Sequence, residues 1–149
     1  PLEHIFDHRD GEVRASCMQA IRRLYFKRSF SLITRGLEDD NAGVKEQAVE
    51  AVRALHFTHA FEPLSRIYRH TRDPKTLDAA MRSIGHIESE EAVEFLIEAL
   101  REAPSKGKDL AAELLVRSDA SGVAEIINRE LAYESGDIRT ALEGVLRRR

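Results

Sequence analysis

The chain has 149 residues, of which 33% are charged, and its formal net charge is −3. This length suffices for one domain with a buried core. The charge balance argues against a nucleic-acid binder, which would carry a strongly basic domain or stripe. No apolar run approaches the roughly 20 residues that cross a bilayer, so we expect no membrane span.

One helical pattern recurs along the chain and organises it. In residues 44–55, VKEQAVEAVRAL, the apolar and small side chains fall on one face at the helical period. The pattern begins at Val13, Val44, Thr76, Gly107 and Ile138, at intervals of 31, 32, 31 and 31 residues. This fixed period predicts an all-α, right-handed α-solenoid of about five two-helix repeats.

A shorter apolar pattern precedes each of these helices and predicts the first helix of each repeat. Leu2 and Phe6 match Ile33 and Leu37 of the second repeat, but the residue that would match Phe30 would precede position 1. The sequence therefore predicts a single domain, 1–149, with a truncated first repeat, cut from a longer protein. The inward faces are expected at Phe30, Ile33 and Leu37; Phe61, Leu64 and Tyr68; Val93, Leu96 and Leu100; and Ala124, Ile127 and Leu131.

The boundaries between helices have local causes. Ser89 precedes two glutamates and is typical of an N-cap, and Asp73 precedes a proline that suits the first helical position. Residues 39–43, 105–107 and 135–137 are rich in Asp, Asn, Ser and Gly, and they predict turns.

The single cysteine and the two methionines fit the core of a repeat. Cys17 stands where later repeats carry alanine, so we expect a buried thiol, and one cysteine excludes an internal disulfide. Met18 and Met81 share a column that faces the neighbouring second helix, which favours packing between repeats over a binding surface. We expect a cytosolic protein, because cysteine is used so sparingly.

Three stretches carry a family resemblance. Residues 60–68 (AFEPLSRIY) and 92–100 (AVEFLIEAL) resemble the first helix of HEAT-like repeats of the phycobilisome-lyase type, and residues 10–15 (DGEVRA) resemble the start of its second helix. The family's acid and base around the first apolar residue are matched by Asp10 with Arg14. They are matched in part by Asn41 with Lys45, by Asp73 alone, and by the base of the pair Ser135 and Arg139. The resemblance covers five repeats and implies an α-solenoid whose second helices line a concave groove.

The candidate site follows from that implied groove. A helical wheel aims the second, sixth and ninth positions after each pattern start away from the core. These columns, with the next position, predict an acidic rim at the helix starts and a basic rim at the helix ends. A simpler interpretation is that both rims merely complement the helix dipoles. The candidate partner-binding residues are Arg22, Glu46, Glu50, Arg53, Asp78, Arg82, His86, Glu113 and Arg147.

Catalytic and metal-dependent classes find little support in the sequence. The chain has neither an HExxH motif nor a His-Glu dipeptide, which iron-binding HEAT-like hydroxylases repeat, and it has no glycine-rich phosphate loop. No serine or cysteine has an assigned His and acid partner. His86 is expected to stabilise a helix C-terminus rather than to act as a base. We therefore expect no cofactor, no metal and no catalytic residue.

Two functional hypotheses remain. The first is a non-enzymatic protein–protein interaction or scaffold module, a monomeric domain of a cytoplasmic signalling or assembly protein. It would bind a partner helix or peptide in the groove, with neither nucleic acid nor membrane as a partner. The second, implied by the resemblance, is a bilin lyase-like subunit or chromophore-handling protein, in which Arg53 and His86 would face the propionates of an open-chain tetrapyrrole.

Overall fold

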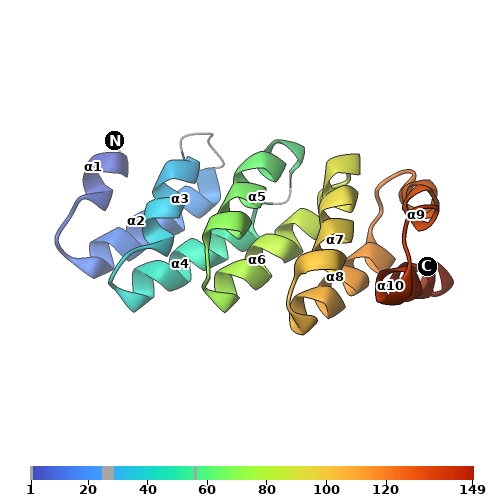
Figure 1. Ribbon diagram of the computed structural model, residues 1–149. Helices are drawn as coiled ribbons and strands as arrows, with labels where there is room; N and C mark the ends of the chain where they lie inside the picture. Colours follow the sequence, from blue (N-terminus) through green and yellow to red (C-terminus); the bar gives the residue numbers. More distant parts are fainter. Residues whose placement is uncertain (1, 25–28, 56) are drawn as a thin grey trace. The chain divides into compact units, whose positions relative to one another are not determined.

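The structure, a computed structural model, describes residues 2–24, 29–55 and 57–149. These residues form ten α-helices, and no strand occurs among them, which confirms the all-α class (Figure 1). Even-numbered helices are the second helices of the predicted repeats, and odd-numbered helices are the first. The elements are α1 (Leu2–Phe6), α2 (Gly11–Leu24), α3 (Ser29–Leu37), α4 (Ala42–Arg53), the short 3₁₀ helix η1 (Thr58–Ala60), α5 (Phe61–His70), α6 (Pro74–Gly85), α7 (Glu90–Glu102), α8 (Ser105–Arg117), α9 (Val123–Leu131) and α10 (Gly136–Arg148).

Side-chain caps explain where several second helices begin. Asn41 Oδ1 accepts the backbone N–H of Gly43 at 2.9 Å, and Asp73 Oδ2 accepts that of Thr76 at 2.8 Å. Asp10 makes the corresponding bond at the start of α2. Each cap satisfies a backbone donor that the first helical turn leaves without a partner. All three caps stand at the same place in the repeat, three residues before the start of the apolar pattern.

All three predicted turns overlap the helices that follow them, and the prediction of a turn at residues 105–107 was wrong. Helix α4 begins at Ala42, inside 39–43, and α10 begins at Gly136, inside 135–137, whereas α8 begins at Ser105 and so contains all of 105–107. Pro104 supplies the carbonyl for the first turn of α8, which Lys108 N–H reaches at 3.0 Å, and the ring of Pro104 fixes a backbone angle that suits this position. Helical glycine at position 107 is required by packing, because a Cβ there would lie 2.8 Å from Ala103 Cβ.

The chain forms two compact units, with α6 contributing to both. Unit 1 comprises Pro1–Leu55 and Glu62–Ala80, and unit 2 comprises His56–Phe61 and Met81–Arg149. Each unit has its own buried residues and its own ion pairs.

In unit 1, α4 packs against α2 and α3, and α1 packs against α2. The predicted apolar stripe of α4 is confirmed, because Val44, Ala48 and Val52 are fully buried. Met18 is also fully buried, and a Cβ added at Gly36 would lie only 2.8 Å from its sulfur. The predicted packing role of Met18 between repeats is therefore confirmed.

In unit 2, α8 packs against α7 and α10, and α9 packs against the same two helices. Leu96 and Ile127, two of the predicted inward residues, are fully buried. The prediction for Ala124 was wrong, since this side chain is exposed and Val123 and Ile126 are buried beside Ile127. Helix α9 begins at Val123, directly after Gly122, which has a left-handed backbone conformation. Its buried face therefore starts at Val123, one residue before the predicted Ala124.

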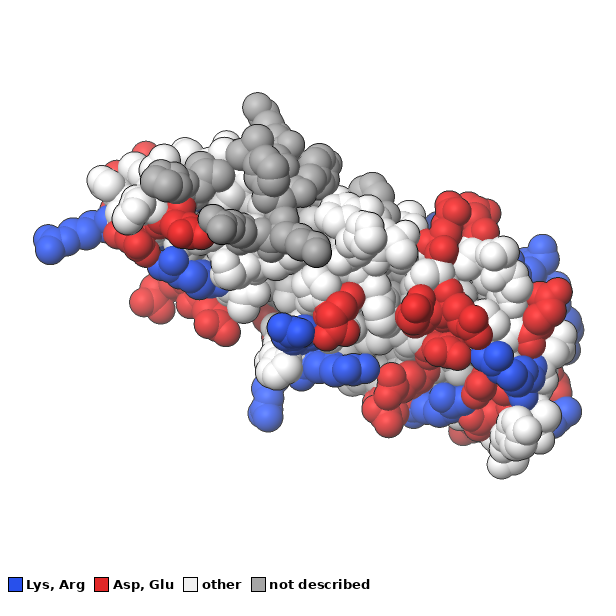
Figure 2. Space-filling view, turned by 90° about the horizontal axis from the view of Figure 1, so that it is seen from above, with Lys and Arg blue, Asp and Glu red and all other residues white. Residues whose placement is uncertain are grey.

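Ion pairs join first helices along the surface of unit 2. Arg101 on α7 donates to Glu130 on α9 and to Glu134 just after it, both at 2.6 Å. Near the start of α7, Glu90 accepts a bond of 3.1 Å from Arg129 on α9. Figure 2 shows the result, with acidic and basic side chains interspersed over this part of the surface. Such interspersed charges stabilise a surface modestly and leave it without a strong field of one sign.

Candidate functional site

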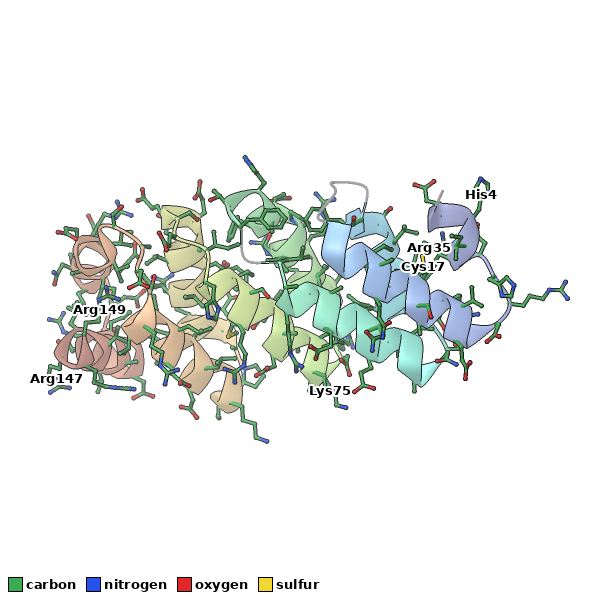
Figure 3. All side chains as sticks on the ribbon, turned by 180° about the vertical axis from the view of Figure 1, so that it is seen from behind. His4, Cys17, Arg35, Lys75, Arg147 and Arg149 are labelled. Atoms are coloured by element: carbon green, nitrogen blue, oxygen red, sulfur yellow. The ribbon has the colours of Figure 1, made fainter. Side chains whose placement is uncertain are left out.

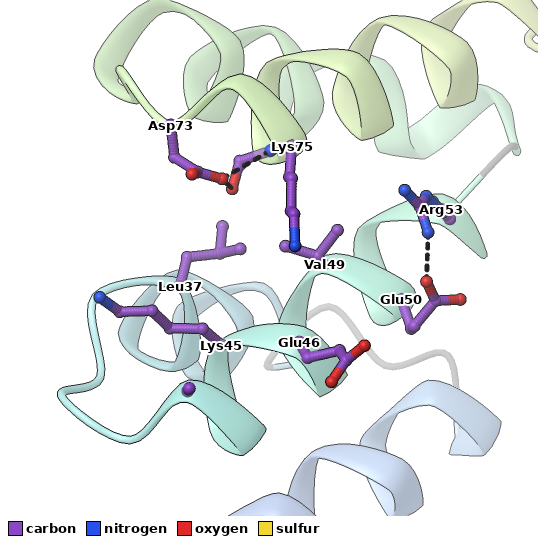
Figure 4. A pocket seen from close by; sticks show the side chains of 10 residues that line it. Leu37, Lys45, Glu46, Val49, Glu50, Arg53, Asp73 and Lys75 are labelled. Atoms are coloured by element: carbon purple, nitrogen blue, oxygen red, sulfur yellow. Dashed lines mark hydrogen bonds and ion pairs between the residues drawn. The ribbon is translucent and has the colours of Figure 1, made fainter.

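A hollow lies in unit 1, between α4 and the start of α6. It has a volume of about 500 Å³, within the usual range of ligand pockets. We call it the α4–α6 cleft (Figure 4). The lining residues are Leu37, Ala42, Lys45, Glu46, Val49, Glu50, Arg53, Asp73, Lys75 and Thr76.

The floor of the cleft is apolar. Val49 is buried on α4, and Leu37, the last residue of α3, is half-buried beside it. Ala42 adds a small side chain at the first position of α4. Figure 4 shows Leu37 and Val49 facing the start of α6 across this floor. The cleft can therefore take an apolar side chain between charged walls.

One acid and one base of the cleft neutralise each other. Arg53 and Glu50, one helical turn apart on α4, form an ion pair and a hydrogen bond. The dashed line in Figure 4 marks this contact. Both residues were predicted to face a partner, and both do line the cleft, but their charges already have an internal partner.

The carboxylate of Asp73 is also engaged within the chain. Its Oδ2 accepts the backbone N–H of Thr76 at 2.8 Å and the Thr76 hydroxyl at 2.7 Å. These two hydrogen bonds are the main reason that the pKa of Asp73 is lowered, and the positive charges of Lys75 and Lys45 lower it further. Asp73 is thus an anion that these bonds hold in place, and it caps the N-terminus of α6.

The two lysines of the cleft differ from these groups. Lys45 and Lys75 are exposed, and neither forms an ion pair with any residue in the described part of the chain. Lys45 comes from α4 and Lys75 from α6, so two successive repeats contribute one cation each. Figure 4 shows the Lys75 side chain extending from α6 towards Val49, over the apolar floor.

Three of the predicted site residues come together in this cleft. Glu46, Glu50 and Arg53 are lining residues. Asp78 belongs to the same unit and is half-buried on α6, outside the lining set. Arg22 lies in α2, and its side chain is outside the described part of the structure.

The remaining predicted residues belong to unit 2 and make local contacts. His86 Nδ1 donates to the carbonyl of Arg82 at 2.7 Å, as expected of a histidine at a helix C-terminus. Glu113 pairs with Arg117 at 2.9 Å, one turn later on α8. Arg147 is exposed on α10, at its outer side in Figure 3. A groove that joins all nine predicted residues stays a prediction.

Sequence reasoning missed Lys45, Asp73 and Lys75 as lining residues. The helical wheel selected the second, sixth and ninth positions, whereas these three residues stand within three residues of a pattern start. A signal was present, because Lys45 occupies the base position and Asp73 the acid position of the repeat that the sequence resembles. Those positions are brought to the cleft because α4 and the start of α6 face each other there (Figure 4).

Metal and thiol chemistry have no assembled site in the described residues. No group of three or more His, Cys, Asp or Glu side chains within 2–24, 29–55 and 57–149 could hold a metal ion. Cys17 is buried, as predicted, and burial raises the pKa of its thiol, which makes it a poorer nucleophile. None of the helices, over the same described ranges, is long and apolar enough to span a bilayer.

The comparisons with known proteins identify the type of repeat. Residues 77–102, most of α6 and all of α7, match the PBS lyase HEAT-like repeat. This is the repeat that the sequence resembles, so the resemblance is confirmed. No curated protein matches the sequence.

Solved structures with the same fold are repeat proteins. A designed armadillo repeat protein in complex with the peptide (KR)4 has a TM-score of 0.54 at 14% identity, covering 99% of this chain and 80% of that chain. The complex of CpcE and CpcF of phycocyanin lyase from Nostoc sp. PCC7120 has a TM-score of 0.52 at 15% identity, covering 97% and 95%. Computationally designed armadillo repeat proteins for modular peptide recognition reach 0.50 at 14% identity, covering 99% and 80%. The α-solenoid fold is confirmed, and at these identities the likeness concerns the fold alone.

Proposed function

We propose that this HEAT-like repeat domain is a non-enzymatic interaction module, which binds a peptide or helical segment of a protein partner in the α4–α6 cleft. The observation that carries the proposal is a hollow with an apolar floor and charged walls, built by the second helices of two successive repeats. An apolar floor supplies affinity by burying a side chain, and charged walls orient the partner.

The chemistry of the lining residues supports binding rather than catalysis. The cleft has no His, Ser or Cys among its described lining residues, and the one hydroxyl, that of Thr76, is buried and donates to Asp73. A nucleophile needs an adjacent base and access to a substrate. Thr76 has no histidine beside it in the described lining, and its burial keeps a substrate away. The neighbours in fold are compatible with this proposal, since two are peptide-recognition proteins by their descriptions.

The proposal is tested by filling the cleft. Peptides would be selected from a random display library on the intact chain, and their affinities measured by titration calorimetry. Ala42→Trp places a large ring at the edge of the cleft, and we expect it to weaken binding at least about tenfold. Ala124→Trp, at an exposed alanine of α9, is the matched control and should leave affinity unchanged. Equal affinity of both variants for the selected peptides would show that the cleft is not the site.

A bilin lyase-like role is the second candidate, and the match of residues 77–102 to the PBS lyase HEAT-like repeat favours it. The cleft volume is within the range of small-ligand pockets, and Arg53 offers a cation, although Glu50 already engages it. Mixing the chain with an open-chain tetrapyrrole and recording absorption and induced circular dichroism tests this role. Unchanged spectra would dispose of it and leave the peptide proposal standing.

A further inference from the structure

We infer that the segment bound in the α4–α6 cleft is acidic, with carboxylates on Lys45 and Lys75 and an apolar side chain between them on Leu37 and Val49. This inference rests on the proposed function and specifies its partner. It would make the site opposite in charge preference to the fold neighbour that is described in complex with the basic peptide (KR)4.

A comparison of two repeat boundaries explains why Lys45 lacks a partner. Between the first and second repeats, Arg14 binds Asp39 through two hydrogen bonds of 2.7 and 2.8 Å. Lys45 stands one repeat after Arg14, and Thr71 stands one repeat after Asp39. The turns are the same in kind, because Asp39 accepts the backbone N–H two residues on at 2.8 Å and Thr71 does so at 3.2 Å.

The replacement of a carboxylate by a hydroxyl at this turn removes the anion that Lys45 would otherwise bind. Thr71 completes the turn, since its Oγ1 accepts from Asp73 N–H, but it brings no charge to the cleft. Lys45 is therefore left as an exposed cation beside a capped helix start. A carboxylate from a partner can occupy the position that Asp39 holds one repeat earlier.

Lys75 provides a second cation at the same place. Lys75, Lys45 and Asp73 line the same cleft. Asp73 cannot satisfy them as a partner would, because its Oδ2 already holds Thr76. Two cations around one engaged anion leave a local excess of positive charge, which favours a carboxylate ligand.

A basic peptide would find fewer available acidic side chains in the cleft than an acidic peptide finds lysines. Of the three acids in the cleft, Glu50 is paired with Arg53 and Asp73 caps α6, so only Glu46 has no described hydrogen-bond partner. Figure 4 shows the Glu46 carboxylate pointing away from Lys75 and the floor. The groups around the apolar floor therefore favour anions, and Leu37 and Val49 favour an apolar residue beside them.

The experiment measures the affinity of the intact chain for three fluorescein-labelled peptides, (EEL)3, (QQL)3 and (KKL)3, by fluorescence anisotropy. We expect (EEL)3 to bind at least about tenfold more tightly than (QQL)3 and to weaken as salt is added. The double variant Lys45→Glu, Lys75→Glu should lose this preference and bind (KKL)3 instead. Glutamate in the first turn of a helix suits the dipole, so both helices should persist, which far-UV circular dichroism verifies.

Two control variants separate local from general effects. Lys106→Glu with Lys108→Glu makes the same change in net charge on α8 and should leave (EEL)3 binding within about twofold. Thr71→Asp supplies the carboxylate that the second boundary lacks, so Lys45 gains an internal partner and (EEL)3 binding should weaken. An equal loss in the Lys106 and Lys108 variant would overturn the assignment to the cleft lysines.

The outcomes distinguish this inference from the proposed function. Tighter binding of (KKL)3 than of (EEL)3 by the wild-type chain would overturn the acidic preference, as would equal binding of (EEL)3 and (QQL)3, while a cleft blocked by Ala42→Trp would still support the proposed function. If none of the three peptides binds, and display selection yields no peptide sensitive to Ala42→Trp, both proposals fail.

Discussion

Arg14 on α2 holds the carboxylate of Asp39 in the turn before α4, with Nε–Oδ2 at 2.7 Å and Nη2–Oδ1 at 2.8 Å. The same guanidinium donates to the carbonyls of His8 and Arg9, at 2.9 and 3.0 Å. One side chain thereby joins the turn between α1 and α2 to the turn that precedes α4 in the next repeat. Two parallel bonds to a planar carboxylate fit the fork geometry of arginine, and lysine would not reproduce them.

The Arg14–Asp39 pair predicts how stability depends on pH. The hydrogen bonds from Arg14 lower the pKa of Asp39 in the folded state. A carboxyl with a lowered pKa stabilises the fold above its unfolded pKa of about 3.9, and this contribution is lost as the pH falls through the folded value. We expect urea unfolding to show stability that falls as the pH drops below about 5.

Asp39→Asn is the test of that assignment. The variant should be less stable than the wild type at neutral pH, and its stability should fall less steeply on acidification, because the titrating partner of Arg14 is gone. Asp119→Asn, at an exposed acid with no described hydrogen bond, is the control and should keep the wild-type slope. Parallel pH curves for wild type and Asp39→Asn would contradict the assignment.

Two glycines predict substitutions of opposite sign. A Cβ at Gly85 would lie 2.7 Å from Leu114 Cδ2 and 3.0 Å from Leu114 Cβ, whereas a Cβ at Gly144 would meet nothing within 4 Å. Gly85→Ala should therefore destabilise by about 1–3 kcal/mol through overpacking, despite the better helix propensity of alanine. Gly144→Ala should stabilise by about 0.5–1 kcal/mol. Urea unfolding measures both, and stabilisation by Gly85→Ala would show that α6 and α8 are less tightly packed than described.

The helix caps predict unequal effects of removing polar side chains. Asn41 caps α4 through Oδ1, whereas Ser135 stands at the start of α10 without a side-chain cap bond. Asn41→Ala should cost roughly 0.5–2 kcal/mol, and Ser135→Ala should change stability little. Thermal unfolding followed by circular dichroism compares the two, and equal shifts in melting temperature would argue against the Asn41 cap.

The apolar core predicts the largest losses. Leu96 on α7 is fully buried, and Leu96→Ala should lower the free energy of unfolding by about 2–5 kcal/mol. Glu46→Ala, at an exposed side chain, should change it by less than about 0.5 kcal/mol. Chemical denaturation of both variants checks the ranking. A small effect at Leu96 would mean that unit 2 relaxes around the lost side chain.

Part of the candidate site could be predicted from the sequence. The helical period placed Glu46, Glu50 and Arg53 on the face of α4 opposite Val44 and Ala48, and all three line the cleft. The period could not show that Glu50 and Arg53 bind each other, because the helical wheel assigned each residue to its own column on the face expected to bind a partner.

The sequence by itself determined the repeat, its period and its buried stripe, because burial of one helical face leaves a periodic record in the order of residues. Only the tertiary structure decided which charged side chains have an ion-pair partner among the described residues. Arg14 finds Asp39 across a repeat boundary, Thr71 offers no such partner to Lys45, and Lys75 reaches over the same cleft from the next repeat. These relations depend on how neighbouring helices are placed, and charge partners between repeats leave no period of their own.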